Sequence, residues 1–159
     1  LRNDSVWADG LLVFYEIFKY LERTMPEVSK KCKIDNLITP ELERTKAFEN
    51  DLDFYLGNNW HRNYIRRRRV QDYLDYLEEL EKKNPILLIA YVYHLYMGLL
   101  SGGIILRKKR NLLKKILPFK KPHTLAGNEV TTFGDYSIYN LKVNMKNKMN
   151  EIAEKFDED

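Results

Sequence analysis

Three glycines interrupt the most apolar and aromatic segment of the chain, Tyr91 to Gly103. Each glycine inside a helix costs roughly 1 kcal/mol relative to alanine, so a helix that keeps several of them needs its backbone close to something flat or bulky. A bound planar cofactor is one such partner. The alternative is that Gly102 and Gly103 end the helix in a left-handed cap. Gly98 does not fit that alternative, because it lies a full turn earlier and apolar residues follow it.

The periodicity of the remaining sequence is helical. Apolar residues recur every three or four positions in five segments, which we predict to be helices: Leu11 to Met25, Pro40 to Gly57, Val70 to Leu80, Pro85 to about Arg107, and Asp135 to Ile152. We expect Pro26 to end the first helix and Thr39 to cap the second. Pro118 to Thr132 has no clear period and is expected to be a loop. Because no long alternating segment indicates a strand, we predict an all-α fold.

The composition fits one soluble domain covering residues 1–159. An apolar fraction of 44% and an aromatic fraction of 13% can form a core, and 31% charged residues keep the surface polar. The longest apolar run, Ile86 to Leu100, is expected to be too short to span a bilayer and to form a core helix. The single cysteine, Cys32, excludes an internal disulfide and suits a reducing compartment.

The glycine segment resembles the distal helix of heme oxygenases, whose motif is roughly Tyr-x-x-Tyr-x-Gly-Asp-Leu-Ser-Gly-Gly. The matching positions are 93–103, with Leu99 in place of the aspartate. Positions 39–60 resemble the family's segment that ends in Asp-Leu-x-Phe-x-x-Gly-x-x-Trp, and positions 141–150 are similar to its basic late helix. The chain is therefore identified as a member of the biliverdin-producing heme oxygenases, with the animal enzymes, insect type included, as the expected relatives.

This resemblance implies a helical fold in which heme, both cofactor and substrate, lies between a proximal helix and a glycine-kinked distal helix. It implies cleavage of heme to biliverdin, carbon monoxide and ferrous iron, with dioxygen and electrons from an acidic NADPH-dependent flavoprotein reductase. It also implies a monomer in the cytoplasm, at the surface of the endoplasmic reticulum. The catalytic set on the distal helix would be Gly98, Leu99, Ser101, Gly102 and Gly103. The heme-binding set would be Tyr93, His94, Gly98, Gly102, Gly103, Lys142 and Lys146, with Tyr93 and the two lysines on the propionates.

Two departures from the family pattern bear on function. The family's iron-ligating histidine precedes the segment matched by Leu1 to Thr24, so we expect the proximal helix to be missing from this chain and leave the metal ligand unassigned. Leu99 cannot accept the hydrogen bonds with which a distal carboxylate holds water, so we expect low activity.

Basic residues form two candidate sets. Lys142 and Lys146 are four positions apart on one helical face, where two ammonium groups can meet a pair of carboxylates; a solvated basic face is the alternative. The second set, Arg66 to Arg69 with Arg107 to Arg110 and Lys114-Lys115, is predicted to form a surface charge field. A net charge of +4 suits an acidic protein, an acidic membrane or nucleic acid. We expect the acidic reductase and no nucleic acid.

The three histidines do not supply the missing ligand by position. His94 lies one turn before Gly98, where it can approach a heme edge or reach the iron, although a hydrogen-bonded core histidine is the commoner arrangement. His61 follows Trp60 in a turn and His123 lies in the expected loop. Two other function classes therefore stay open: a heme-binding or storage protein of the same fold with weak or no turnover, and a basic helical interaction module without a cofactor.

Overall fold

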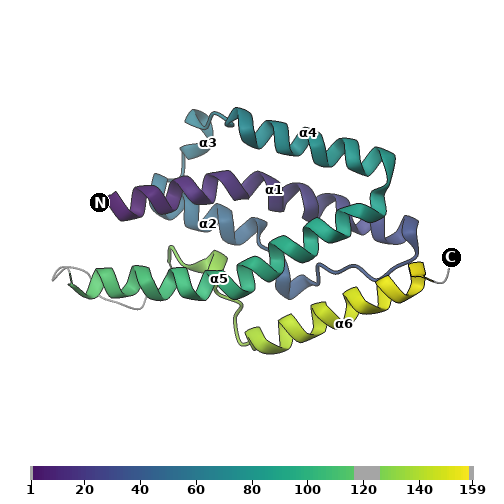
Figure 1. The fold of residues 1–159 in the computed structure, drawn as a ribbon. Coiled ribbons are helices and arrows are strands. Elements are labelled where there is room, and N and C mark those ends of the chain that lie inside the picture. The colour runs from purple at the N-terminus through teal and green to yellow at the C-terminus, as the bar shows by residue number, and fades with distance from the viewer. Residues whose placement is uncertain (1, 117–125, 158–159) are drawn as a thin grey trace.

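The computed structural model describes residues 2–116 and 126–157, and within them the chain is all-α (Figure 1). The helices are α1 (Arg2–Cys32), α2 (Thr45–Leu56), α3 (Trp60–Asn63), α4 (Arg68–Lys83), α5 (Leu88–Ile116) and α6 (Ile138–Asp157). Short 3-10 turns at Pro40–Leu42, Pro85–Leu87 and Glu129–Thr131 lie between them. The predicted fold class is confirmed.

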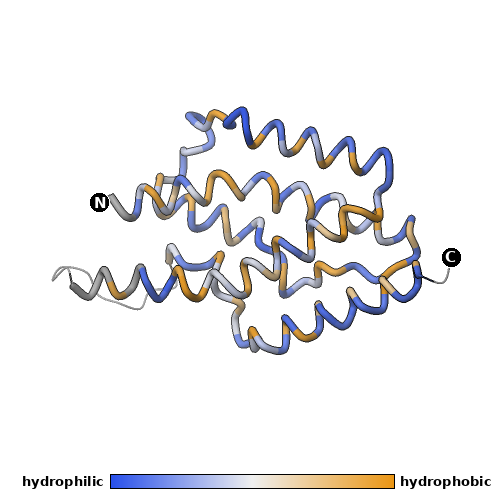
Figure 2. Tube along the Cα trace, in the orientation of Figure 1, coloured by the Kyte–Doolittle hydropathy of each residue, from blue (hydrophilic) through white to orange (hydrophobic). Residues whose placement is uncertain are grey.

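One core joins the helices around α1, which contacts α2, α4 and α5, while α6 packs on α5. Figure 1 shows α4 on one side of α1 and α2, with α5 and α6 on the other. Leu21 of α1, Leu52 of α2, Leu77 of α4 and Val92 of α5 are fully buried. Hydrophobic positions recur between hydrophilic ones along α4 and α6 (Figure 2), as expected for helices that bury one stripe.

The first helix is longer than predicted, because α1 continues through Pro26 to Cys32. Proline removes one helical hydrogen bond, but Pro26 itself is exposed while Met25 and Val28 beside it are buried. Burial of the last turn offsets the lost bond. Lys33, with φ 55°, then ends the helix in the left-handed region.

The second predicted helix is two elements. Thr39 makes no side-chain cap hydrogen bond, and the turn Pro40–Leu42 stops before Arg44. The cap of α2 comes instead from α1, because Glu22 accepts hydrogen bonds from the backbone N–H groups of Arg44 (2.5 Å) and Thr45 (3.0 Å). A cap from a distant helix has no local sequence signal.

The glycine-bearing helix α5 runs to Ile116, well beyond the expected end near Arg107. Gly98, Gly102 and Gly103 all lie inside it and none has a positive φ, so the cap alternative is wrong. Figure 1 shows α5 bending near its middle.

The expectation that the apolar segment is too short to span a bilayer is also wrong. By length and composition alone, Pro85–Lys109 is long and apolar enough to cross a membrane. A core helix passes the same test, and Val92, Tyr96 and Leu100 are buried in the core. Only 33% of the most apolar window is buried, which leaves much of α5 uncovered by the described residues.

Smaller differences concern the connections. A short helix, α3, begins at Trp60 and includes His61, which was expected in a turn, and the last helix begins at Ile138 instead of Asp135. The expected loop from Pro118 to Thr132 contains the turn Glu129–Thr131, while residues 117–125 lie outside the described residues.

Candidate functional site

One face of α5 is open. His94, Gly98 and Ser101 are exposed and Gly102 is half-buried, at spacings of three and four that place them on one side of the helix. A Cβ atom built on Gly98 or Gly102 would meet no atom within 4 Å. The two glycines therefore leave a strip of bare backbone, one turn long, that a flat group can approach closely. We call this strip the glycine face.

The other two members of the predicted distal set point elsewhere. Gly103 is buried, and a Cβ there would lie 3.1 Å from Thr131 Cγ2 and 3.5 Å from Leu99 Cδ1. Leu99 is half-buried and packs against the core. The structure thus divides the set, with Gly98, Ser101 and Gly102 toward the open side and Leu99 and Gly103 toward the turn at 129–131.

The predicted propionate residues lie on two helices in contact. Tyr93 of α5 and Lys142 of α6 are half-buried, Lys146 is exposed, and α5 packs on α6. Neither lysine nor Tyr93 has a hydrogen bond or ion pair with another described residue, whereas Lys148 approaches the Asn36 carbonyl at 3.5 Å. Lys142 and Lys146 can therefore meet an incoming carboxylate without first breaking an ion pair to a described residue.

The structure excludes the core-histidine interpretation of His94, because this side chain is exposed and lies on the side of the glycine face. His61 stacks on Trp60 with ring centroids 3.7 Å apart, and His123 lies outside the described residues. No group of three or more His, Cys, Asp or Glu side chains gathers as a metal site in residues 2–116 and 126–157. The iron ligand stays unassigned.

Behind the glycine face, α5 is tied to the core by Tyr96. This side chain is fully buried, and its hydroxyl donates a hydrogen bond to Glu22 Oε1 at 2.7 Å. Burial, with the nearby Glu22 carboxylate, raises the pKa of Tyr96 well above its ordinary value. The ring packs on Phe18 with centroids 4.9 Å apart. Tyr96 therefore stays a neutral hydrogen-bond donor, held on a carboxylate of α1.

A second buried group holds the segment that faces Gly103. The guanidinium of Arg44 donates to the carbonyl oxygens of Glu129 (3.3 Å) and Thr132 (2.7 Å) and stacks on the Phe133 ring at 4.1 Å. The carboxylate of Asp51, 0% exposed, accepts hydrogen bonds from the N–H groups of Glu129 and Val130, both at 2.9 Å.

Gly127 fixes the entry into this segment. It has a φ of 77°, and a Cβ there would lie 2.5 Å from the Tyr55 hydroxyl, which donates to its carbonyl at 2.7 Å. Sequence reasoning did not single out Glu22, Arg44 or Asp51, although Asp51 lies inside the quoted motif.

Part of the predicted surface charge field is paired with acidic side chains of the protein itself. Arg66 pairs with Glu16 at 2.9 Å, Arg67 pairs with Asp9, and Arg68 approaches Asp72 at 4.0 Å. The pairs of Arg66 and Arg67 join the segment before α4 to α1, whereas Arg68 and Asp72 pair within α4, so the arginine run serves the fold as well as the surface.

Arg107 also has a structural partner, since it donates to the Thr131 carbonyl at 3.3 Å and to Thr132 Oγ1 at 3.0 Å. The side chains of Arg110, Lys114 and Lys115 lie outside the described part of the molecule.

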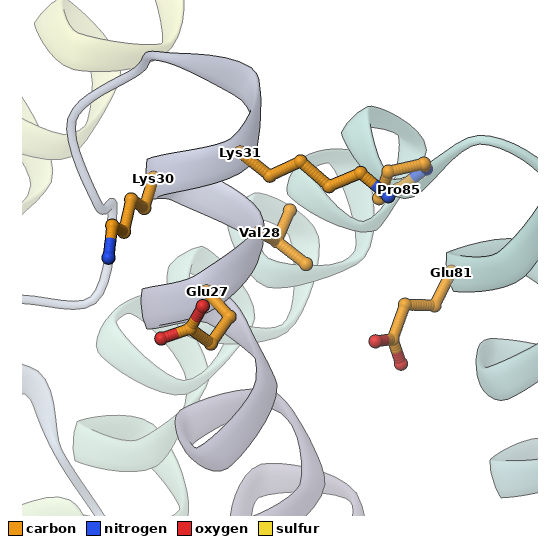
Figure 3. A pocket seen from close by; sticks show the side chains of 6 residues that line it. All are labelled: Glu27, Val28, Lys30, Lys31, Glu81 and Pro85. Carbon is orange, nitrogen blue, oxygen red and sulfur yellow. The ribbon is translucent and has the colours of Figure 1, made fainter.

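Two clefts lie away from these residues. One cleft, of about 460 Å³, lies between the end of α1 and α4. Figure 3 shows Lys31 extending toward Pro85, and Glu81 of α4 lying across the cleft from α1. Its lining is charged and contains no aromatic ring. A second cleft of about 420 Å³ is lined by aromatic and apolar residues around Trp60 and by Arg67. Neither includes a residue predicted for the site.

Several known heme oxygenases are similar to this chain. The sequence profile of the heme oxygenase family matches residues 3–155. Heme oxygenase of Rhodella violacea is 30% identical over 133 residues, covering 84% of this chain and 53% of the relative. Heme oxygenase 1 of Gallus gallus is 34% identical over 113 residues, covering 70% of this chain and 36% of the relative. The chain thus spans about half, or less, of the length of these curated relatives.

A solved structure resembles the fold. The crystal structure of heme oxygenase 2 from Chlamydomonas reinhardtii without heme superposes with a TM-score of 0.75 at 26% sequence identity, covering 91% of this chain and 67% of that chain. The predicted heme oxygenase-like architecture is confirmed.

Proposed function

The chain belongs to the heme oxygenase family, and we propose that it binds heme on the glycine face of α5 and cleaves it to biliverdin, carbon monoxide and ferrous iron. The glycine face is the observation that carries this proposal. No contact among the described residues requires glycine at Gly98 or Gly102, since a Cβ atom at either position would enter open space. Each still costs roughly 1 kcal/mol of helix stability. A flat ring lying on the bare backbone supplies the missing reason.

Heme also carries two propionates, and basic side chains lie on the helix that packs on α5. Lys142 and Lys146 lie on the neighbouring helix, where their ammonium groups would bind the two propionates together with the Tyr93 hydroxyl. Lysine binds a carboxylate as a point charge, whereas arginine would grip it with two parallel hydrogen bonds. We therefore propose that in-plane orientation depends strongly on the shape of the pocket.

Bound heme would supply the iron that activates dioxygen and the ring carbon that reacts, so it serves as cofactor and substrate. The chain's own part is to hold the ring, fix its rotation and position water. His94 and Ser101 are the exposed polar side chains beside the glycines and can hold water there. Leu99 accepts no hydrogen bond and packs toward the core, so we propose slow turnover.

We further propose that electrons come from an acidic NADPH-dependent flavoprotein reductase. A net charge of +4 and the exposed Lys108, Lys109 and Lys146 would attract such a partner. We also propose that the protein is a monomer in a reducing, cytoplasmic compartment, at the surface of the endoplasmic reticulum.

A second candidate function is heme binding or storage with little turnover, and Leu99 is the observation that favours it. A basic interaction module without a cofactor is less well supported, because Arg66, Arg67 and Arg68 approach acidic side chains of the protein itself.

The distinguishing experiment supplies the full-length protein with heme, dioxygen, NADPH and the reductase. An oxygenase forms biliverdin and carbon monoxide in equal amounts. A storage protein shows the heme absorbance band but releases no product. An interaction module shows neither, and either of these two results would reject the proposed activity.

A further inference from the structure

We propose that Tyr96 is a positioning residue, whose hydrogen bond to Glu22 sets the rotation of α5 and thereby the place of the glycine face relative to the heme ring. This inference rests on the proposed function. It concerns a residue that does not face the ligand.

The first observation is the geometry of α5. At 3.6 residues per turn, Gly98 lies about 200° and Gly102 about 240° around the helix from Tyr96. Tyr96 is fully buried, whereas Gly98 is exposed. The buried hydroxyl thus holds the back of the helix, directly behind the glycine face.

The acceptor of this hydrogen bond is itself fixed. Glu22 also accepts from the backbone N–H groups of Arg44 (2.5 Å) and Thr45 (3.0 Å) and from the Thr45 hydroxyl. With Tyr96 at 2.7 Å, these donors occupy both carboxylate oxygens. A carboxylate that caps α2 cannot follow a rotation of α5, so it acts as a rigid reference point.

A second attachment lies on the other side of the glycine face. The turn at 129–131 touches α5 at Gly103, and Arg107 donates to Thr131 and Thr132 of that segment. Arg44 joins the two attachments, because its N–H binds Glu22 and its guanidinium binds the Thr132 carbonyl. Gly98 and Gly102 therefore lie along α5 between these two attachments.

The sensitivity of the site follows from helix dimensions. With Cα atoms about 2.3 Å from the axis, a rotation of about 20° moves each glycine Cα by about 0.8 Å. A shift of about 1 Å between reacting groups can change a rate about 100-fold. A small loss of anchoring at Tyr96 is therefore enough to change which ring carbon is attacked.

The test compares Tyr96→Phe with Tyr15→Phe in the full-length protein. Tyr15 is a matched control: it is buried in aromatic contacts and donates to a glutamate, Glu49, at 2.9 Å, but its hydrogen bond joins α1 to α2 and does not involve α5. Both variants keep the ring. Tyr96→Phe loses the hydrogen bond to Glu22, and Tyr15→Phe loses the bond to Glu49 together with the one that Lys19 donates at 3.2 Å. In the ligand-free protein, hydrogen exchange at residues 97–103 should be about fivefold to tenfold faster in Tyr96→Phe and unchanged in Tyr15→Phe.

With heme bound, Tyr96→Phe should alter the ratio of heme orientations, measured from hyperfine-shifted methyl signals in proton NMR, and the ratio of biliverdin isomers. Thr131→Ser, which removes the methyl group beside Gly103 and keeps the hydroxyl, should change the same ratios in the heme-loaded protein.

Equal exchange in the two tyrosine variants would overturn the anchor. Faster exchange with unchanged heme orientation and isomer ratio would overturn its role in positioning. Because exchange is measured without heme, failure of the anchor is distinguishable from failure of the proposed function, which appears as absent heme binding in the wild type.

Discussion

Replacing Gly98 or Gly102 with alanine should stabilise the protein and weaken its binding of heme. Neither added methyl group meets a protein atom within 4 Å, so the helix gains intrinsic stability without a clash. The free energy of unfolding should rise by about 1 kcal/mol per substitution, which is roughly 2 to 4 °C in Tm. The same methyl group would lie between the backbone and a bound ring. Overpacking of this kind costs about 1 to 3 kcal/mol, or roughly fivefold to 150-fold in Kd.

Gly10→Ala is the control for this prediction. Gly10 also lies inside a helix, α1, and a Cβ there meets no atom within 4 Å. It should give the same gain in stability and leave the Kd for heme unchanged. Urea unfolding of the ligand-free protein measures stability, and absorbance titration with heme measures affinity. Wild-type heme affinity in Gly98→Ala and Gly102→Ala, with the helix content intact, would refute the close approach of the ring to the backbone.

Three further predictions concern the surrounding residues. The double variant Lys142→Ala with Lys146→Ala should lose about 1 to 2 kcal/mol of heme binding and broaden the mixture of biliverdin isomers, measured by titration and chromatography; wild-type values would return both lysines to a solvated surface. Leu99→Asp should lower the free energy of unfolding by about 1 to 3 kcal/mol, because half-buried apolar contacts are lost, yet raise biliverdin per reductase electron in single-turnover absorbance; an unimproved yield would show that Leu99 does not limit turnover. The hydrogen bond between the Tyr91 and Tyr76 hydroxyls favours neutral Tyr91 and raises its pKa to about 12 from the ordinary value of 10.0, so its contribution to stability is complete below pH 10 and is lost as the pH rises toward 12. Tyr76→Phe should reduce that alkaline loss in urea unfolding, and an unchanged slope would contradict the assignment.

The sequence predicted the elements that local chemistry decides. Apolar spacing located the stripes of α2, α4 and α5, and the glycine pattern of positions 93–103 indicated the face on which function is proposed. Gly57, with φ 86°, ends α2 where expected. These features depend on neighbours within one or two turns, which a single sequence displays.

The errors have a common physical origin in contacts between distant segments. Glu22 caps α2 and binds Tyr96 across 74 residues, and Arg44 reaches Thr132 across 88. Burial of Val28 carries α1 past Pro26, which local rules treat as a stop. No spacing rule reveals such partners, so the buried anchors behind the glycine face became visible only in three dimensions.

The most direct test of the account is the structure of the full-length protein with heme bound. We predict that the ring lies on α5 with the backbone of Gly98 and Gly102 in van der Waals contact, about 3.5 to 4 Å from the ring plane. The propionates should extend toward Lys142 and Lys146. A ring bound away from α5, for example in the cleft beside Trp60, would contradict the central claim that the glycine face is the heme site.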